Sequence, residues 1–399
     1  MKLLIAVPAY NEEAAIESTI VRCLEAKERL PRHGTVSEVE ITVVSDGSTD
    51  RTVELARRHE GPIRLIVFER NRGYGAAIKE AWSRSDAELL GFLDADGTCD
   101  PMFFEDLCAA LERERAGVAL GSRLSPASKM PPVRRMGNVL YALLLSAFAR
   151  VPVRDTASGM RVVRRDVLAG LLPLPDGLQF TPAMTARALM SGGVKLVEIE
   201  MPYREREGQS KLKVGKDGLR FLKAILDMVF LYRPWRPLTL LALLSLALAV
   251  ALMTMPAEYY LAHRSVQEWM IYRFIVSHLA GTNAVLMLSA AYISERIVRI
   301  ALGRGSLRDP VTAFFASGAF WAVPAALMTA GLLLVMPSLI ELVRTGATYE
   351  HWSRFIAMSF CFSTALILIA TKAVHYVLEL LNEHLEHRPA PGGALRSNR

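Results

Sequence analysis

Cysteine is scarce in this sequence, and the spacing that metal-binding cysteines require is absent. The four cysteines, Cys23, Cys99, Cys108 and Cys361, are scattered along 399 residues. This distribution excludes the paired pattern of zinc sites and supports no disulfide framework, so we expect reduced thiols. No internal repeat is visible, although the long apolar segments can pair as hairpins.

A complete dinucleotide-binding fingerprint is also missing. Residues 71–77 read NRGYGAA and contain Gly-x-Gly. The run follows the third expected strand rather than the first, and it lacks the later glycine of the fingerprint. We therefore expect no nicotinamide cofactor, while a glycine loop that lets the backbone approach another ligand stays open.

Charged residues become sparse after about residue 230, although the whole chain is only 52% hydrophobic. Each of four later segments is long enough to cross a hydrocarbon core of roughly 30 Å. They cover residues 237–256, 274–293, 311–336 and 355–379. An even number of spans leaves both ends of the chain on one side of the membrane.

Lysine and arginine in the short connections indicate which side that is. The stretch before the first span and the second loop are basic, with Lys211, Lys213, Lys216, Arg220, Lys223, Arg233, Arg236, Arg296, Arg299, Arg304 and Arg308. The first loop has only Arg264 and Arg273, and the third only Arg344. The N-terminal region and both termini are therefore expected in the cytoplasm.

Within the last span, Lys372, His375 and Glu379 share a helix face near the expected cytoplasmic end. Snorkelling to the interface is the favoured reading, and a lipid-headgroup or transport site is the alternative.

The first 213 residues alternate short apolar runs with amphipathic stretches, which predicts an α/β domain with a mostly parallel sheet. The expected strands are Leu3–Val7, Glu40–Val44, Ile63–Phe68, Glu88–Leu93 and Val118–Gly121. The expected helices are Glu12–Arg29, Asp50–His59, Ala76–Ser85 and Pro101–Arg115. Ligands bind beyond the carboxyl ends of strands in such sheets.

Polar clusters follow three of these strands, and Asp94-Ala95-Asp96 is the most informative of them. Two carboxylates can share a hard cation there if the chain turns, and Gly97 supplies the turn. Such a cation completes its shell with water and phosphate oxygens, which suits a nucleotide diphosphate. A pair that caps the helix starting near Pro101 is the alternative.

Two stretches have the pattern of interfacial amphipathic helices. In residues 134–150 the apolar positions recur at helical spacing beside Arg134 and Arg135, and a second stretch runs from Leu219 to Val229 between Lys216 and Lys223. Both can instead pack on the sheet as core helices. Two such helices would hold a site against a bilayer, where a lipid phosphate can enter.

Seven segments together resemble family 2 glycosyltransferases, above all the dolichyl-phosphate mannose synthase and polyprenyl-phosphate glycosyltransferase branch. They are VPAYNEE, VVSDGSTDRT, RNRGYGAAIKEA, FLDADG, GSR, DTASGMR and REGQSKL, in that order over about residues 1–213. The resemblance implies a GT-A fold, a Rossmann-like domain that binds a nucleotide sugar.

The same resemblance implies roles for individual residues. Nucleoside contacts fall to Pro8, Tyr10, Glu12, Val44 and Asp46, with Asp46 reading the base. Asp94, Ala95 and Asp96 hold the diphosphate, the ribose and a metal, Mg²⁺ or Mn²⁺, with Asp94 and Asp96 as its ligands. Arg123 reaches the donor or acceptor phosphate, and Arg206 with Lys211 embraces the phosphates from a mobile loop.

Catalysis of sugar transfer needs the charge on the departing diphosphate to be neutralised. The acidic pair with its metal and the basic loop from Arg204 to Lys216 supply this. Juxtamembrane charge that anchors to anionic lipid is the alternative for the loop, and the two roles are compatible. A phosphate monoester acceptor is already largely ionised at neutral pH, so a strong base is less necessary. Asp155 is the best base candidate, and it can equally orient Arg161 or a phosphate-binding cation.

The chain departs from the family pattern at three places. Ser45-Asp46 replaces a double aspartate, Thr98 stands where the mannose synthases often have Gln, and residues 179–184 lack a carboxylate. These departures leave the sugar open. A processive polysaccharide synthase is one alternative, although Trp235-Arg236 reverses that class's Arg-Trp pair; a non-catalytic membrane partner or flippase subunit is another.

The sequence therefore predicts a GT-A domain over residues 1–213, a juxtamembrane helix over 214–235, a four-helix membrane domain over 236–382 and a disordered tail over 383–399. The expected enzyme is a metal-dependent hexosyltransferase at the cytoplasmic face of a bacterial inner membrane, and the resemblance implies that it inverts the anomeric carbon. It moves one sugar from GDP-mannose or a UDP-hexose to undecaprenyl or dolichyl phosphate. No nucleic-acid partner is expected, and a homo-oligomer stays open.

Overall fold

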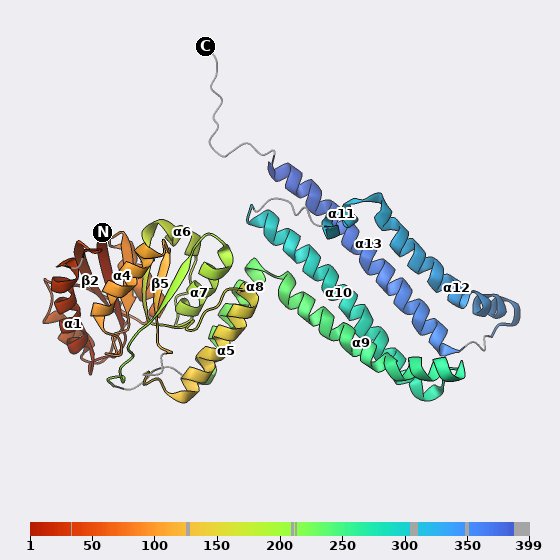
Figure 1. The fold of residues 1–399 in the computed structure, drawn as a ribbon, viewed down its shortest axis with the longest axis horizontal. Helices are drawn as coiled ribbons and strands as arrows, with labels where there is room; N and C mark the ends of the chain where they lie inside the picture. The colour runs from red at the N-terminus through yellow and green to blue at the C-terminus, as the bar shows by residue number, and fades with distance from the viewer. Residues whose placement is uncertain are drawn as a thin grey trace, which may run out of the picture. The chain divides into compact units, whose positions relative to one another are not determined.

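The computed structural model describes residues 1–32, 34–124, 128–208, 211, 214–303, 310–347 and 351–386. By internal contacts the chain divides into two units, Met1–Tyr232 and Arg233–Arg399. The first unit holds the sheet and its helices, and the second is helical (Figure 1).

The first unit is built on one seven-stranded sheet with the order β3-β2-β1-β4-β6-β5-β7. The strands are β1 (Lys2–Ala9), β2 (Glu38–Ser45), β3 (Arg64–Val67), β4 (Leu89–Leu93), β5 (Val118–Ser122), β6 (Met160–Arg164) and β7 (Leu196–Glu200). Only β6 runs antiparallel to its neighbours β4 and β5. The expected mostly parallel sheet is therefore confirmed, and its five expected strands correspond to β1–β5.

Helices cover both faces of this sheet (Figure 1). They are α1 (Ile16–Arg29), α2 (Thr52–Arg57), α3 (Tyr74–Ser83), α4 (Phe104–Arg113), α5 (Pro132–Ala149), α6 (Leu168–Leu171), α7 (Phe180–Ser191) and α8 (Val214–Tyr232). Alternate residues of β1 point to opposite faces. Leu3 and Ile5 therefore join an apolar cluster with α1 and α4, while Leu4 and Ala6 join another with α3 and α7.

A third apolar cluster joins α5, α7 and α8 beside the sheet. Leu145 of α5, Met190 of α7 and Ile225 of α8 are buried in it. α5 and α8 lie side by side (Figure 1). Each of the two helices thus buries one face and leaves the other exposed. The buried face matches the prediction of a core helix, and the exposed face matches the prediction of an interfacial helix.

Among its described residues, the second unit contains four helices long and apolar enough to cross a membrane. Its helices are α9 (Trp235–His263), α10 (Ile271–Ala301), α11 (Pro310–Ala316), α12 (Ala322–Thr345) and α13 (Trp352–Glu386). The third candidate span covers Gly318–Thr345, so the expected start at residue 311 falls in the separate short helix α11. Residues 383–386 of the expected tail end α13, and residues 387–399 lie outside the described part of the chain.

Polar residues of α13 contact neighbouring helices of the second unit. His375 is buried and contacts the hydroxyl of Tyr292, at 2.9 Å between Nδ1 and Oη. Glu379 pairs with the buried Arg296 of α10, and Lys372 donates to the carbonyl of Phe315 in α11. Partners on neighbouring helices thus take up hydrogen bonds of these side chains, and snorkelling of their charged ends to the interface stays a prediction.

Candidate active site

A cavity of about 540 Å³ opens in the first unit, at the edge of the sheet where β1, β2, β4 and β5 end. Most of the residues singled out by the sequence line it: Pro8, Tyr10, Glu12, Asp46, Asp94, Ala95, Asp96, Arg123, Arg206 and Lys211. They come together because parallel strands bring their carboxyl ends to one edge. Val44 and Asp155 are not part of the lining.

Val44 and Asp46 lie at the end of β2, beside the cavity. The Val44 side chain is fully buried in the apolar cluster under α3, so it offers no side-chain contact to a nucleoside. Asp46 is 3% exposed, and its two oxygens accept hydrogen bonds from the backbone N–H groups of Arg72 (2.6 Å) and Gly73 (2.9 Å). Asp46 thus holds the loop before α3 in place and also lines the cavity, so its reading of a base stays a prediction.

Asp94 follows β4 and lies in a tight pocket of its own. The hydroxyl of Tyr74, the first residue of α3, donates to its Oδ1 at 2.6 Å. A Cβ atom at Gly159 would overlap the Asp94 carboxylate, so only glycine allows this approach. Burial, and then repulsion from Asp96, raises the pKa of Asp94 to about 7.

Asp96 is held by two kinds of partner. Its Oδ1 accepts from the hydroxyl of Thr98 at 2.6 Å, so Thr98 orients the carboxylate directly. Its Oδ2 pairs with Arg206 Nη1 at 2.9 Å, and Arg206 Nη2 reaches Glu12 Oε1 at 2.5 Å. Gly97 makes the expected turn, with φ at +76°.

Arg206 and Lys211 converge on the acidic edge of the cavity. The Lys211 ammonium lies 2.7 Å from Glu12 Oε1 and also donates to the backbone carbonyl of Asn11. Gln209, Ser210 and Leu212 of the REGQSKL segment lie outside the described residues. Two cations therefore stand where a diphosphate would meet the acidic pair, which fits the role that the sequence predicts for them.

The donor set at this edge fits a divalent metal bound together with a diphosphate. Across the described ranges, no group of three or more His, Cys, Asp or Glu side chains could hold a metal by itself. Mg²⁺ is usually held by one or two carboxylates, with water and phosphate oxygens completing its shell. Burial is the main cause of the raised pKa of Asp94 and repulsion from Asp96 adds to it, so a cation bound by both carboxylates would favour their charged forms.

Metal binding should therefore depend on pH. Because the Asp94 pKa is raised from 3.8 to about 7, the metal-free protein loses stability as pH rises through this range, and a bound cation offsets that loss most above pH 7. With nucleoside diphosphate present, we expect Mn²⁺ to bind about tenfold more weakly at pH 6 than at pH 8. Calorimetry at the two pH values measures this, and Asp94→Asn should leave only the smaller difference that comes from titration of the diphosphate itself. Equal affinities in the parent protein would contradict the assignment.

Asp155 is buried under the cavity and does not fit the role of a base. Its carboxylate forms a bidentate pair with Arg123, at 2.8 Å to Nε and 2.9 Å to Nη2. Burial alone would raise its pKa, but the charge and hydrogen bonds of Arg123 outweigh burial and hold the pKa at about 2. A carboxylate with so low a pKa is a weak base near neutral pH, and Asp155 is not part of the cavity lining, so Asp155 positions Arg123.

The alternative partner of Asp155, Arg161, is engaged elsewhere. Arg161 is fully buried, and its guanidinium donates to the carbonyls of Thr156 (2.8 Å) and Ser158 (3.0 Å) and to the Thr185 hydroxyl (2.8 Å). These bonds fasten the loop between Asp155 and β6 onto α7. Arg161 therefore helps to set Gly159 against Asp94.

The cavity continues from the acidic pair along α5 and α8. Its lining there includes Arg134 and Tyr141 of α5 and Lys216, Arg220 and Phe221 of α8. Tyr141 Oη donates to the carbonyl of Gly218 at 2.9 Å and joins the two helices. Basic and apolar groups thus share this end, as an amphiphilic anion would require.

Sequence reasoning did not single out Tyr74, Asn138, Gly159 or Tyr203. Tyr203 lines the cavity, with the Arg123 guanidinium 5.8 Å from its ring centre. Tyr74 lies in the glycine loop and Gly159 in the DTASGMR segment, so both segments were recognised, but the residues' contact with Asp94 spans 20 and 65 positions. A local sequence pattern cannot predict contacts between residues so far apart in the chain.

Comparison with known proteins agrees with this geometry. Residues 4–172 match the model of glycosyl transferase family 2. The low-salt glycan biosynthesis hexosyltransferase Agl6 of Haloferax volcanii is 30% identical over 326 residues, which cover 78% of this chain and 72% of that protein. The dolichyl-phosphate hexose transferase of the same organism is 31% identical over 57% of this chain and 93% of its own length.

A solved structure is also similar. The glucosyl-3-phosphoglycerate synthase of Mycobacterium tuberculosis, crystallised with Mn²⁺, UDP and phosphoglyceric acid, is 21% identical. The match covers 57% of this chain and 78% of that one, with a TM-score of 0.47.

This chain belongs to glycosyl transferase family 2. It is a glycosyltransferase with a GT-A domain followed by a helical region, as the motifs implied, and the reading as a non-catalytic partner is set aside.

Proposed function

We propose that the protein transfers one sugar from a nucleotide diphosphate sugar to a polyprenyl phosphate, with inversion at the anomeric carbon. The observation that carries the proposal is the cavity, which runs from the acidic pair and its cations to the mixed basic and apolar end between α5 and α8. A relative named as a dolichyl-phosphate hexose transferase supports the same class of acceptor.

In this reaction an acceptor phosphate oxygen forms a bond to the anomeric carbon, and the bond from that carbon to the diphosphate breaks. The electron pair leaves with the nucleoside diphosphate. A divalent metal held by Asp94 and Asp96 would neutralise charge on the diphosphate. Arg206 and Lys211 add positive charge at the same edge, and Arg123, fixed by Asp155, faces the anionic groups from β5.

The acceptor explains why a general base is dispensable. Its phosphate has a second pKa near 6 and is mostly ionised at neutral pH. Asp155 with its pKa at about 2 is suited to holding a cation rather than removing a proton. Positioning and electrostatic stabilisation therefore carry the rate.

The proposal is tested by incubating the purified full-length protein with Mn²⁺, undecaprenyl phosphate and a panel of nucleotide sugars including GDP-mannose and UDP-glucose. We expect one donor to yield a lipid carrying a single sugar in the inverted configuration. A polymeric product would favour a processive synthase instead, and no product with any donor would overturn the proposal.

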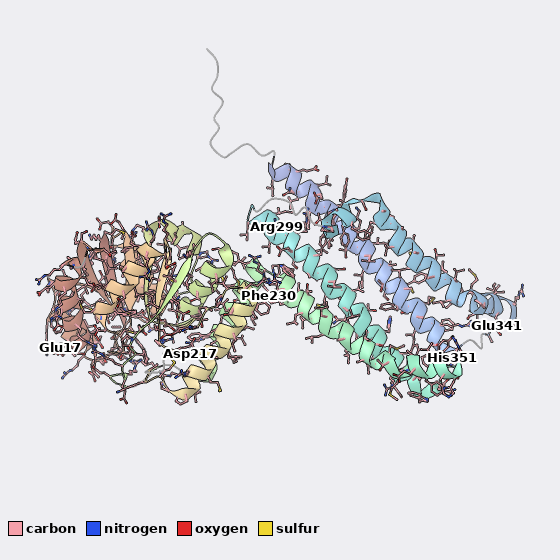
Figure 2. The ribbon with its side chains drawn as sticks, viewed as in Figure 1. Glu17, Asp217, Phe230, Arg299, Glu341 and His351 are labelled. Carbon is pink, nitrogen blue, oxygen red and sulfur yellow. The ribbon has the colours of Figure 1, made fainter. Side chains whose placement is uncertain are left out.

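We further propose that the catalytic unit faces the cytoplasm and rests on the membrane through α5 and α8. α8 ends at Tyr232 and α9 begins at Trp235, so the chain passes from α8 into the first candidate span almost at once. Leu219 of α8 is 70% exposed and Phe230 is 44% exposed (Figure 2 labels Phe230). Apolar groups beside lysine and arginine are typical of helices at an anionic bilayer surface.

Orientation can be measured by cysteine labelling. In intact cells, a single cysteine introduced at Glu17 should resist a membrane-impermeant maleimide, while one introduced at Arg264 should react, because the basic connections favour the cytoplasm. Both are tested in a variant whose four native cysteines are replaced by serine. The reverse pattern would contradict the proposed orientation.

A further inference from the structure

α5 has two faces with different tasks. Met136, Leu140 and Leu143 form an exposed apolar stripe, with exposed fractions of 71%, 62% and 64%. Asn138 is only 6% exposed. At 100° per residue along a helix, Asn138 points away from the centre of the stripe by about 180°. Asn138 is thus a polar group on the buried side of α5, the helix that we propose lies on the membrane.

Within the described part of the chain, the side-chain hydrogen bonds of Asn138 all lead to the loop that carries Asp155. Its Nδ2 donates to Asp155 Oδ1 at 2.7 Å. Its Oδ1 accepts from the backbone N–H of Thr156 at 3.2 Å and from the hydroxyl of Thr156 at 3.1 Å. A small movement of α5 therefore moves three hydrogen bonds at once.

A movement of Asp155 would in turn shift Arg123, which lines the cavity. Asp155 is fully buried, and besides its two bonds to the Arg123 guanidinium it accepts from the Arg123 backbone N–H at 3.0 Å. Glu198 of β7 accepts from the backbone N–H of Asp155 at 2.8 Å and anchors the loop on its other side. Asp155 is thus held between α5 and the sheet, and the direction of the Arg123 side chain depends on both.

We propose that Asn138 is a positioning residue that couples the seating of α5 on the membrane to the orientation of Arg123, through Asp155. The inference rests on the proposed function, because it requires an anionic substrate at Arg123 and a bilayer at the exposed stripe. The enzyme would then reach full activity only when α5 is seated, so the donor would be spared from hydrolysis away from the lipid acceptor.

The coupling is measurable with a double-mutant cycle in the full-length protein, reconstituted in vesicles of phosphatidylcholine and phosphatidylglycerol. One arm is Met136→Gln with Leu140→Gln, which weakens the apolar stripe without touching the cavity lining. The other arm is Asn138→Ala. A water-soluble short-chain prenyl phosphate serves as acceptor, so that access to the bilayer does not limit the reaction.

We expect Asn138→Ala to lower kcat/KM for the acceptor about tenfold while the Kd of the nucleoside diphosphate changes less than about twofold. The stripe variant should lower kcat/KM about fivefold in the parent and less than about twofold in the Asn138→Ala background, because the connection is already broken there. Should Asn138→Ala fail to fold, Asn138→Ser, which leaves a smaller gap, carries the same test.

Ser146→Ala is the matched control. Ser146 is also on α5 and bonds to the same loop, through the backbone of Val153, at 3.1 Å and 3.3 Å, but it does not touch Asp155. In the Ser146→Ala protein, the stripe variant should still lower kcat/KM about fivefold, as it does in the parent. Additive effects of the stripe and Asn138 changes, or equal behaviour of the Ser146 and Asn138 variants, would overturn the coupling while leaving the transferase intact. A parent protein without product would overturn the proposed function and the coupling together.

Discussion

Replacing Asp96 by asparagine is expected to lower sugar transfer by about 10³-fold or more, since it removes negative charge where the metal and diphosphate meet. Asp96 is 6% exposed, and its two oxygens are aimed by Thr98 and Arg206. Asparagine keeps the shape but presents only one oxygen. The measurement is the initial rate at saturating donor, together with Mn²⁺ binding by calorimetry.

Asp100→Asn is the matched control for this change. Asp100 lies four residues further along the same loop, caps the turn at Met102 and pairs with Arg204 outside the cavity lining. Its asparagine variant keeps the capping oxygen, so we expect near-parental transfer. Full activity of Asp96→Asn, or equal losses in both variants, would remove the proposed metal role.

Replacing Asp155 by alanine is expected to have the largest effect on stability. The change leaves the Arg123 guanidinium, whose side chain is 13% exposed, without its carboxylate. Removing one partner of a buried ion pair costs about 3–5 kcal/mol. Thermal unfolding should therefore begin roughly 6–20 °C lower, because 1 kcal/mol moves the Tm of a domain this size by about 2–4 °C.

Asp155→Asn separates charge from shape in the same pocket. It should retain more of the stability than alanine but still lose transfer, because a neutral amide holds Arg123 less firmly. Asp86→Ala serves as the control, since Asp86 is 85% exposed in its pair with Lys2, and such pairs contribute little. A Tm of Asp155→Ala within about 1 °C of the parent would contradict the buried pair as described, given the shift expected per kcal/mol.

Much of the first unit could be predicted because its pattern is local. Apolar runs such as Leu3–Val7 and Leu89–Leu93 are buried on both faces, so they read as strands without knowledge of their neighbours. β6 and β7 were missed. β7 is only half-buried along most of its length, and β6 is a five-residue strand that enters between β4 and β5 against their direction. Neither property has a signature in a single short segment.

The sequence indicated which chemical groups lie at the strand ends, but it did not indicate the role of each residue. Asp94 and Asp96 stand out because two carboxylates close an apolar strand, and the cavity contains both. Asp155 also looked like a reactive carboxylate, yet its partner Arg123 lies 32 positions away and fixes it as a positioning group. Likewise, helical spacing put Lys372, His375 and Glu379 on one face, but only the packing of α10 and α11 against α13 showed what that face meets.

The sequence by itself determined the α/β pattern of the first unit, the acidic pair after β4, the family, and four segments apolar enough to cross a membrane. These follow from properties of neighbouring residues, namely hydropathy, period and motif order. The tertiary structure alone decided that Tyr74 and Gly159 enclose Asp94, that Asp155 holds Arg123, and that Asn138 connects α5 to them. The reason is physical: hydrogen bonds and burial at the site join side chains that are distant in the chain, and the folding of the sheet and its helices brings them within reach.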